Sequence, residues 1–213
     1  MDSLQAAIHR CNLEFDNPTE GHGNCFPNAI VQQCRRPLIK SWLIENKPFA
    51  IFKAQAAVRK NITNFALKSN HETVSELKSK YETELRTVER KSWMDYWTCM
   101  AKDGTWVDHM FVQMTAWYME LDILIVTSSS TPEAPFILIS GDIHKSGKTN
   151  GPPILIGNHT NIHYQSLVNQ NGHKLEEELK ISSNFEHEPQ EMDKFNDFTY
   201  FQNGIKITKR EKK

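Results

Sequence analysis

The sequence predicts an α+β fold in which helices pack around a small, largely antiparallel sheet. Apolar residues recur at helical intervals through about the first 120 residues, whereas the apolar runs between 122 and 168 are short and separated by turns rich in proline and glycine. A chain that places its helices first and its strands later favours helices packed on a sheet whose neighbouring strands run antiparallel.

Two helices are expected near the start of the chain. Asp2 and Ser3 can cap the first. Its apolar residues share one face: Leu4, Ala7, Ile8 and Cys11. The segment 16–24, DNPTEGHGN, has the composition of a turn. The second helix is expected to begin near Cys25 and to end before Pro37.

The middle third of the chain is expected to be helical. Between 48 and 67, apolar residues recur at near-helical intervals: Phe49, Phe52, Ala56, Ile62 and Phe65. A second apolar stripe lies on a long charged helix: Val74, Leu77, Tyr81, Leu85 and Val88. Because this stripe is narrow, we expect it to pack on the core rather than bind a partner.

A further helix is expected after the turn at Asp103 and Gly104. Its apolar face comprises Trp106, Met110, Met114, Trp117 and Leu121. Val107 and Phe111 widen this face, which indicates a central, buried helix. Asp108 is expected to cap the helix or pair with a lysine rather than contact a substrate.

Four strands complete the predicted domain, which spans residues 1–168. They are DILIV at 122–126, FILIS at 136–140, PILIG at 153–157 and NIHYQSLV at 161–168. Residues 169–213 are polar and carry the charge runs EEE and KREKK. We expect this C-terminal extension to be partly disordered or to add a hairpin through DFTYFQNGIKI.

Composition excludes several classes of partner. Lys and Arg number 25 against 26 Asp and Glu, so no global field favours nucleic acid or an anionic membrane. The first residues, MDSLQAAIHR, carry an acid and polar groups where a secretory signal needs an apolar stretch. We therefore expect a cytoplasmic or nuclear monomer with no nucleic-acid or membrane partner.

Among the four cysteines, Cys25 stands apart. No two cysteines have CxxC spacing, and we expect Cys11, Cys34 and Cys99 to be free thiols that pack as small apolar groups. Cys25 follows two glycines and an asparagine at an expected helix start. Such a position, together with an adjacent histidine, favours the nucleophilic thiolate. Cys25 is thus a candidate nucleophile; the alternative is a buried sulfur that follows a turn.

His163 is the best candidate for the base. It lies on a predicted strand, where Asn161 and Gln165, two residues away on either side, project to the same face. A carboxamide at either position can hold the imidazole by its other nitrogen. Taken alone, however, this pattern is more often that of a surface histidine on a strand.

Two other kinds of site are not favoured. His159 and His163 lie four residues apart, but no third ligand with convincing spacing accompanies them, so neither a metal nor another cofactor is expected. The stretch GDIHKSGKT is similar to a phosphate-binding loop, but Asp142 stands at the first glycine of that pattern. It is expected to be a loop only.

Three segments together resemble the ovarian-tumour (OTU) family of cysteine proteases. GHGNCFPNAI resembles the family's nucleophile segment, Asp-Gly-Asn-Cys-Leu-Phe-x-Ala, and MAKDGTWVDHMFVQMTAWYMELDILIV resembles its Trp-Gly-Asp helix and the strand after it. NIHYQSL resembles its His-Tyr-Asn/Asp-Ser-Val strand. The three segments occur in the family's order and cover roughly residues 13–168.

The resemblance implies a papain-like fold and a deubiquitinase, a hydrolase that cleaves after the C-terminal glycine of ubiquitin or a ubiquitin-like protein. It implies Cys25 as nucleophile, His163 as general base and Gln165 as the group that orients the histidine, with Asn161 as the alternative. The backbone N–H groups of His22, Gly23 and Cys25 would form the oxyanion hole. The alternatives are a ubiquitin-binding domain with little or no catalysis and a viral or mobile-element polyprotein protease.

Overall fold

The computed structural model describes residues 3–19, 23–85, 92–131, 134, 136–159, 163–169, 200–202 and 205–207. The chain divides into two compact units, Met1–Ser183 and Asn184–Lys213. In the second unit, strands β6 (Tyr200–Gln202) and β7 (Ile205–Ile207) form an antiparallel pair within the stretch in which the sequence suggests a hairpin. Most of the predicted extension after Asn169 lies outside the described residues.

The first unit contains a five-stranded sheet with the order β1-β5-β4-β2-β3. Its strands are β1 (Leu13–Phe15), β2 (Ile123–Thr127), β3 (Ile137–Ile139), β4 (Ile154–His159) and β5 (His163–Asn169). Strands β2 and β4 are parallel, and the other neighbouring pairs are antiparallel. The predicted α+β class, with a largely antiparallel sheet, is confirmed.

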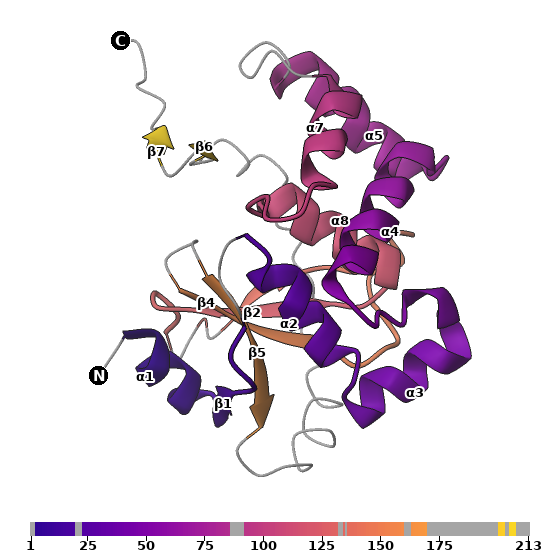
Figure 1. Ribbon diagram of the computed structural model, residues 1–213. Helices are drawn as coiled ribbons and strands as arrows, with labels where there is room; N and C mark the ends of the chain where they lie inside the picture. Colours follow the sequence, from indigo (N-terminus) through magenta and orange to yellow (C-terminus); the bar gives the residue numbers. More distant parts are fainter. Residues whose placement is uncertain are drawn as a thin grey trace. The chain divides into compact units, whose positions relative to one another are not determined.

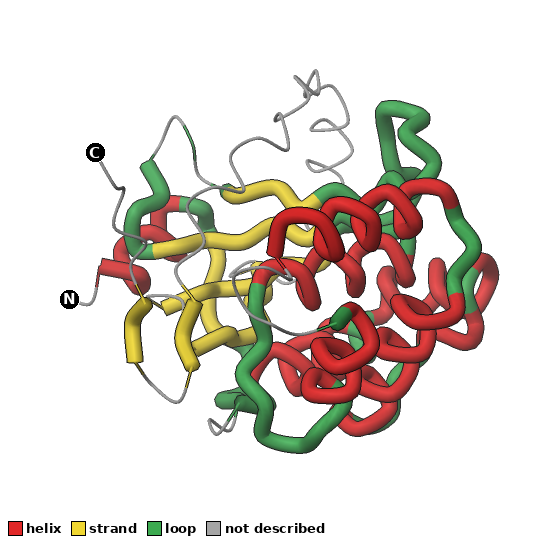
Figure 2. The backbone as a smooth tube through the Cα atoms, turned by 90° about the horizontal axis from the view of Figure 1, so that it is seen from above, coloured by secondary structure: helices red, strands yellow, loops and turns green. Residues whose placement is uncertain are grey.

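Most helices gather beside the sheet as a separate layer (Figures 1 and 2). The α-helices are α1 (Ser3–Arg10), α2 (Cys25–Gln33), α3 (Pro37–Asn46), α4 (Gln55–Lys68), α5 (Glu72–Lys80), α7 (Trp93–Met100) and α8 (His109–Met119). A 3₁₀ turn, η1 (Pro48–Ala50), and a π-helical turn, η2 (Tyr81–Leu85), accompany them. Among the described residues, no helix has the length and apolar character needed to cross a membrane.

Each face of the sheet buries a different set of side chains. Ile123 and Ile156 belong to the large core formed with α2 and α8, whereas Val126 and Leu155 pack with Ile8 of α1. Successive residues of a strand point to opposite faces, so these apolar strands are covered on both sides. The sheet therefore lies between α1 and the main helical layer.

Helix α8 starts three residues later than the sequence predicts. The Asp108 side chain accepts a hydrogen bond from the Phe111 N–H at 3.1 Å and caps the helix, so residues 106 and 107 precede it. The predicted placement of Trp106 on the buried face is wrong, because this side chain is 44% exposed. The expected capping by Asp108 is confirmed; Tyr96 Oη also donates to this carboxyl at 2.6 Å, and burial raises the pKa of Asp108.

Two other predicted helices are shorter than expected. The stretch from 48 contains η1 and reaches regular helix only at Gln55, and the charged helix α5 gives way to the π-helical turn at Tyr81. Val88, the last member of the predicted stripe, lies outside the described residues. Helices α3 and α7 and strand β1 are not among the individual elements predicted from the sequence.

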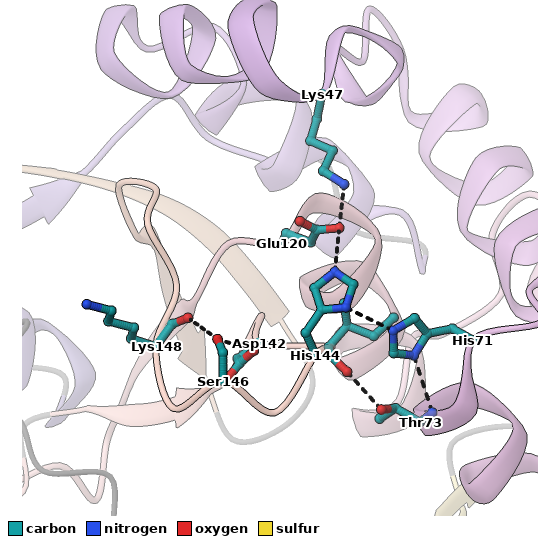
Figure 3. A network of polar contacts seen from close by, with 9 residues as sticks. Lys47, His71, Thr73, Glu120, Asp142, His144, Ser146 and Lys148 are labelled. Atoms are coloured by element: carbon teal, nitrogen blue, oxygen red, sulfur yellow. Dashed lines mark hydrogen bonds and ion pairs between the residues drawn. The ribbon is translucent and has the colours of Figure 1, made fainter.

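A polar network joins the ends of three helices to the loop after β3 (Figure 3). Lys47, after α3, forms an ion pair with Glu120, which ends α8. His71 caps α5 by accepting from the Thr73 N–H, and its Nε2 lies 3.1 Å from Nδ1 of His144. These contacts hold the C-terminal ends of α3 and α8 and the N-terminal end of α5 near the loop of residues 141–150.

A buried arginine of α4 joins two loops that lie next to the start of α2. Arg59 is 1% exposed, and its guanidinium donates to the carbonyl oxygens of Gly23 at 2.7 Å, Thr105 at 2.5 Å and Met100 at 2.9 Å. It also donates to the side-chain oxygen of Asn24 at 3.0 and 3.1 Å. A buried charge needs this degree of hydrogen bonding to offset its desolvation.

We expect Arg59→Met to lower the free energy of unfolding by about 3 kcal/mol, because several buried acceptors lose a charged donor. Lys60→Met is the matched control, since Lys60 is the next residue of α4 and is exposed. It should change stability by less than about 0.5 kcal/mol. Urea denaturation measures both, and equal losses in the two variants would contradict the structural role of Arg59.

Candidate active site

Cys25 is the first residue of α2, as the sequence predicts, and it is 2% exposed. The next residue, Phe26, is fully buried, and its ring packs edge-on against Tyr164 at 5.2 Å and Phe111 at 6.3 Å between centroids. Pro27 fits in the first turn because its missing N–H would have no partner within the helix. Core packing thus fixes the start of the helix that carries the thiol.

Helix α2 and strand β5 run side by side in the same direction. Phe26 packs on Tyr164 near one end, and Gln33 donates to Ser166 Oγ at 2.7 Å and to the Leu167 carbonyl at 2.8 Å near the other. Seven residues of helix and three residues of strand each span about 10 Å, so the two sets of contacts match in length. The first residues of α2 and β5 therefore lie at the same end.

Those first residues are Cys25 and His163. Burial raises the pKa of Tyr164, and the charges of Asp108 and Cys25 raise it further. Cys25 therefore lies near Tyr164, the residue that follows His163. The structure thus brings the regions of the predicted nucleophile and the predicted base together, although the two residues are 138 positions apart in the sequence.

The backbone before Cys25 adopts a conformation that favours glycine. Gly23 has φ of +81°, and a Cβ atom at this position would lie 2.0 Å from the carbonyl oxygen of Gly104. A side chain at this position would displace either the segment around Gly23 or the loop that contains Gly104. Of the three predicted oxyanion donors, Gly23 and Cys25 are in this segment, and His22 lies outside the described residues.

Asn24 links this segment to the loop after α7. Its Oδ1 accepts from Arg59 and from the Gly104 N–H at 3.1 Å, and its Nδ2 donates to Asp103 at 3.0 Å. Because its side chain is committed to these partners, Asn24 makes no side-chain cap on α2. Arg59 and Asn24 together fix the turn that places Cys25.

The charge of Arg59 acts on the same site. Burial lowers the pKa of Arg59, whereas the charges of Asp103 and Cys25 oppose this change. An arginine remains protonated in proteins, so Arg59 contributes a fixed positive charge near Cys25. Arg59 thus belongs to the electrostatic surroundings of the candidate nucleophile.

His163 lies opposite His159 in the antiparallel pair of β5 and β4. Burial lowers the pKa of His163 from its ordinary value, and the positive charge of His159 lowers it further. A histidine with a lowered pKa is neutral near pH 7 and can accept a proton. The environment of His163 is therefore suited to a general base.

One of the two predicted orienting groups, Gln165, makes no hydrogen bond to His163 among the described residues. Gln165 pairs with Gly157 across the sheet, and no hydrogen bond joins it to His163 within the part of the chain that the structure describes. Asn161 lies outside the described residues. Instead, Thr19 Oγ1 lies 3.4 Å from His163 Nε2. No sequence signal predicts Thr19 at this site, because it occurs in a stretch of turn composition with no periodic pattern.

No family model matches the chain, and no curated protein matches its sequence. Its structure is similar to the OTU domain of OTUD1, with a TM-score of 0.50 and 12% sequence identity over 78% of this chain and 92% of that one. An OTU deubiquitinase from Wolbachia pipientis wMel bound to ubiquitin aligns with a TM-score of 0.49 and 13% identity, over 76% of this chain and 98% of that one. The likeness to the OTUD1 domain shows that this chain has an OTU fold.

Proposed function

We propose that this chain is a cysteine-type deubiquitinase, which cleaves the isopeptide or peptide bond after the C-terminal glycine of ubiquitin or a ubiquitin-like protein. The main support for the proposal is that α2 and β5 begin at the same end of the domain. Their first residues are Cys25 and His163. The OTU fold and the three OTU-like segments support the same activity.

In the proposed reaction, His163 takes the proton of the Cys25 thiol, and the thiolate attacks the carbonyl carbon of the scissile bond. The resulting tetrahedral oxyanion accepts hydrogen bonds from the backbone N–H groups of Gly23 and Cys25, with His22 as a third donor. Collapse of this species breaks the C–N bond, and His163 returns the proton to the leaving lysine amine. A thioester on Cys25 remains.

Water completes the cycle. His163 removes a proton from the water as it attacks the thioester carbonyl, and the Cys25 sulfur leaves as the ubiquitin carboxylate forms. Arg59 supports both stages by holding Gly23 and Asn24, the residues directly before Cys25, in place through hydrogen bonds. The proposed mechanism requires only side chains and backbone groups of this chain.

Ubiquitin with a C-terminal electrophile tests the proposed function. The wild-type chain and Cys99→Ala should form a covalent adduct, and Cys25→Ala should not, because the electrophile occupies the position of the scissile carbonyl. Mass spectrometry of the intact protein detects the adduct. An adduct in Cys25→Ala would contradict the role of Cys25, and non-covalent binding without an adduct in the wild type would instead favour a ubiquitin-binding domain.

Cys25 and Cys34 form a matched pair for a reactivity test, since they lie at opposite ends of α2 and are 2% and 1% exposed. Burial raises the pKa of Cys34 to about 12, so this thiol is protonated near neutral pH. We expect brief treatment with iodoacetamide to modify Cys25 at least about tenfold faster than Cys34. Peptide mass spectrometry measures both rates, and equal rates would contradict activation of Cys25.

The pH profile tests the role of His163. This residue acts as a base only above its pKa, which the positive charge of His159 lowers. His159→Gln removes that charge and raises the pKa, so the acidic limb of kcat/KM should move to higher pH by less than about one unit. His144→Gln is the control, because His144 belongs to the separate network at the helix ends. An unmoved limb in His159→Gln would contradict the assignment.

A further inference from the structure

The hydroxyl of Thr19 lies between two groups at the start of β5. Thr19 is 7% exposed, and its Oγ1 is 2.7 Å from the carbonyl oxygen of Tyr164 and 3.4 Å from Nε2 of His163. Its position follows from the pairing of β1 with β5, in which Phe15 lies opposite Leu167. Counting four residues past the end of β1, and four residues back along β5, places Thr19 opposite His163.

The segment that carries Thr19 is anchored along this path. The Asp16 N–H donates to the Ser166 carbonyl at 2.9 Å, and Ser166 Oγ donates to the Asp16 carboxylate at 3.1 Å. Gln33 of α2 donates to the same Ser166 hydroxyl. These hydrogen bonds therefore fix three parts of the chain relative to one another: the segment before Thr19, strand β5 and helix α2.

The two contacts of Thr19 determine which nitrogen of His163 carries the proton. A carbonyl oxygen can only accept, so the single hydroxyl proton of Thr19 points to Tyr164 at the shorter distance. The hydroxyl oxygen is then the acceptor for His163, and Nε2 must be the donor. In the neutral imidazole this leaves the lone pair on Nδ1.

We propose that Thr19 is the positioning residue of His163, in place of the carboxamide that the sequence suggests at Gln165. The inference rests on the proposed function, in which His163 is the general base. Thr19 holds the imidazole in the Nε2–H tautomer and fixes the ring, so that Nδ1 receives the proton of Cys25. It also accepts a stronger hydrogen bond once the imidazolium has formed.

Three variants test this role. Thr19→Val keeps the shape of the side chain and removes the hydroxyl, Thr19→Ser restores the hydroxyl, and Gln165→Ala removes the predicted carboxamide. With a fluorogenic ubiquitin substrate, we expect Thr19→Val to lower kcat about tenfold with little change in KM, since it removes one hydrogen bond to the base. Thr19→Ser and Gln165→Ala should stay within about threefold of the wild type.

A second readout requires no ubiquitin and therefore separates this inference from the proposed function. Ring-nitrogen chemical shifts of isotope-labelled histidine, assigned with His163→Gln, report the tautomer of His163. We expect the Nε2–H form in the wild type and in Thr19→Ser, and a mixture of tautomers in Thr19→Val. An Nδ1–H tautomer in the wild type, an unchanged tautomer in Thr19→Val, or a Thr19→Ser variant as impaired as Thr19→Val would overturn the inference.

Discussion

The buried guanidinium of Arg59 is the constraint on which the geometry of the candidate site depends. Two of its acceptors, Gly23 and Asn24, directly precede Cys25. The others are Met100, the last residue of α7, and Thr105, in the loop that follows. A buried cation must satisfy its donors, so these segments cannot separate without a large loss of hydrogen bonding. The same guanidinium holds the segment before Cys25 in place and supplies a positive charge near it.

The core elements of the fold could be predicted from the sequence because they follow local patterns. Helix α2 and strands β2 and β4 have clear apolar periodicity and turn residues at their ends. Strand β1 has only three residues, and its extended conformation depends on pairing with β5. Strand β5 begins 150 positions after β1 begins, so a local sequence pattern cannot reveal this pairing. Trp106 was misplaced because the apolar spacing continues past the residue at which Asp108 caps α8.

The residues of the candidate site could be predicted only where they lie in a segment with a local sequence pattern. Cys25 and His163 each lie in a segment with a turn or strand signature, and the structure brings the starts of their elements to the same end. Arg59 has the local appearance of a surface charge on a helix, and only the tertiary fold makes it a buried link between loops. Thr19 approaches His163 through the register of a strand pair, which no spacing in the sequence encodes.

The central claim is that Cys25 and His163 act as one coupled pair at the common end of α2 and β5. Titration of the His163 ring by NMR in the wild type, Cys25→Ser and Cys34→Ser tests this claim most directly. Because a neighbouring thiolate favours the imidazolium, His163 should titrate at lower pH in Cys25→Ser, whereas Cys34→Ser should match the wild type. Identical His163 titrations in the wild type and Cys25→Ser would contradict the account.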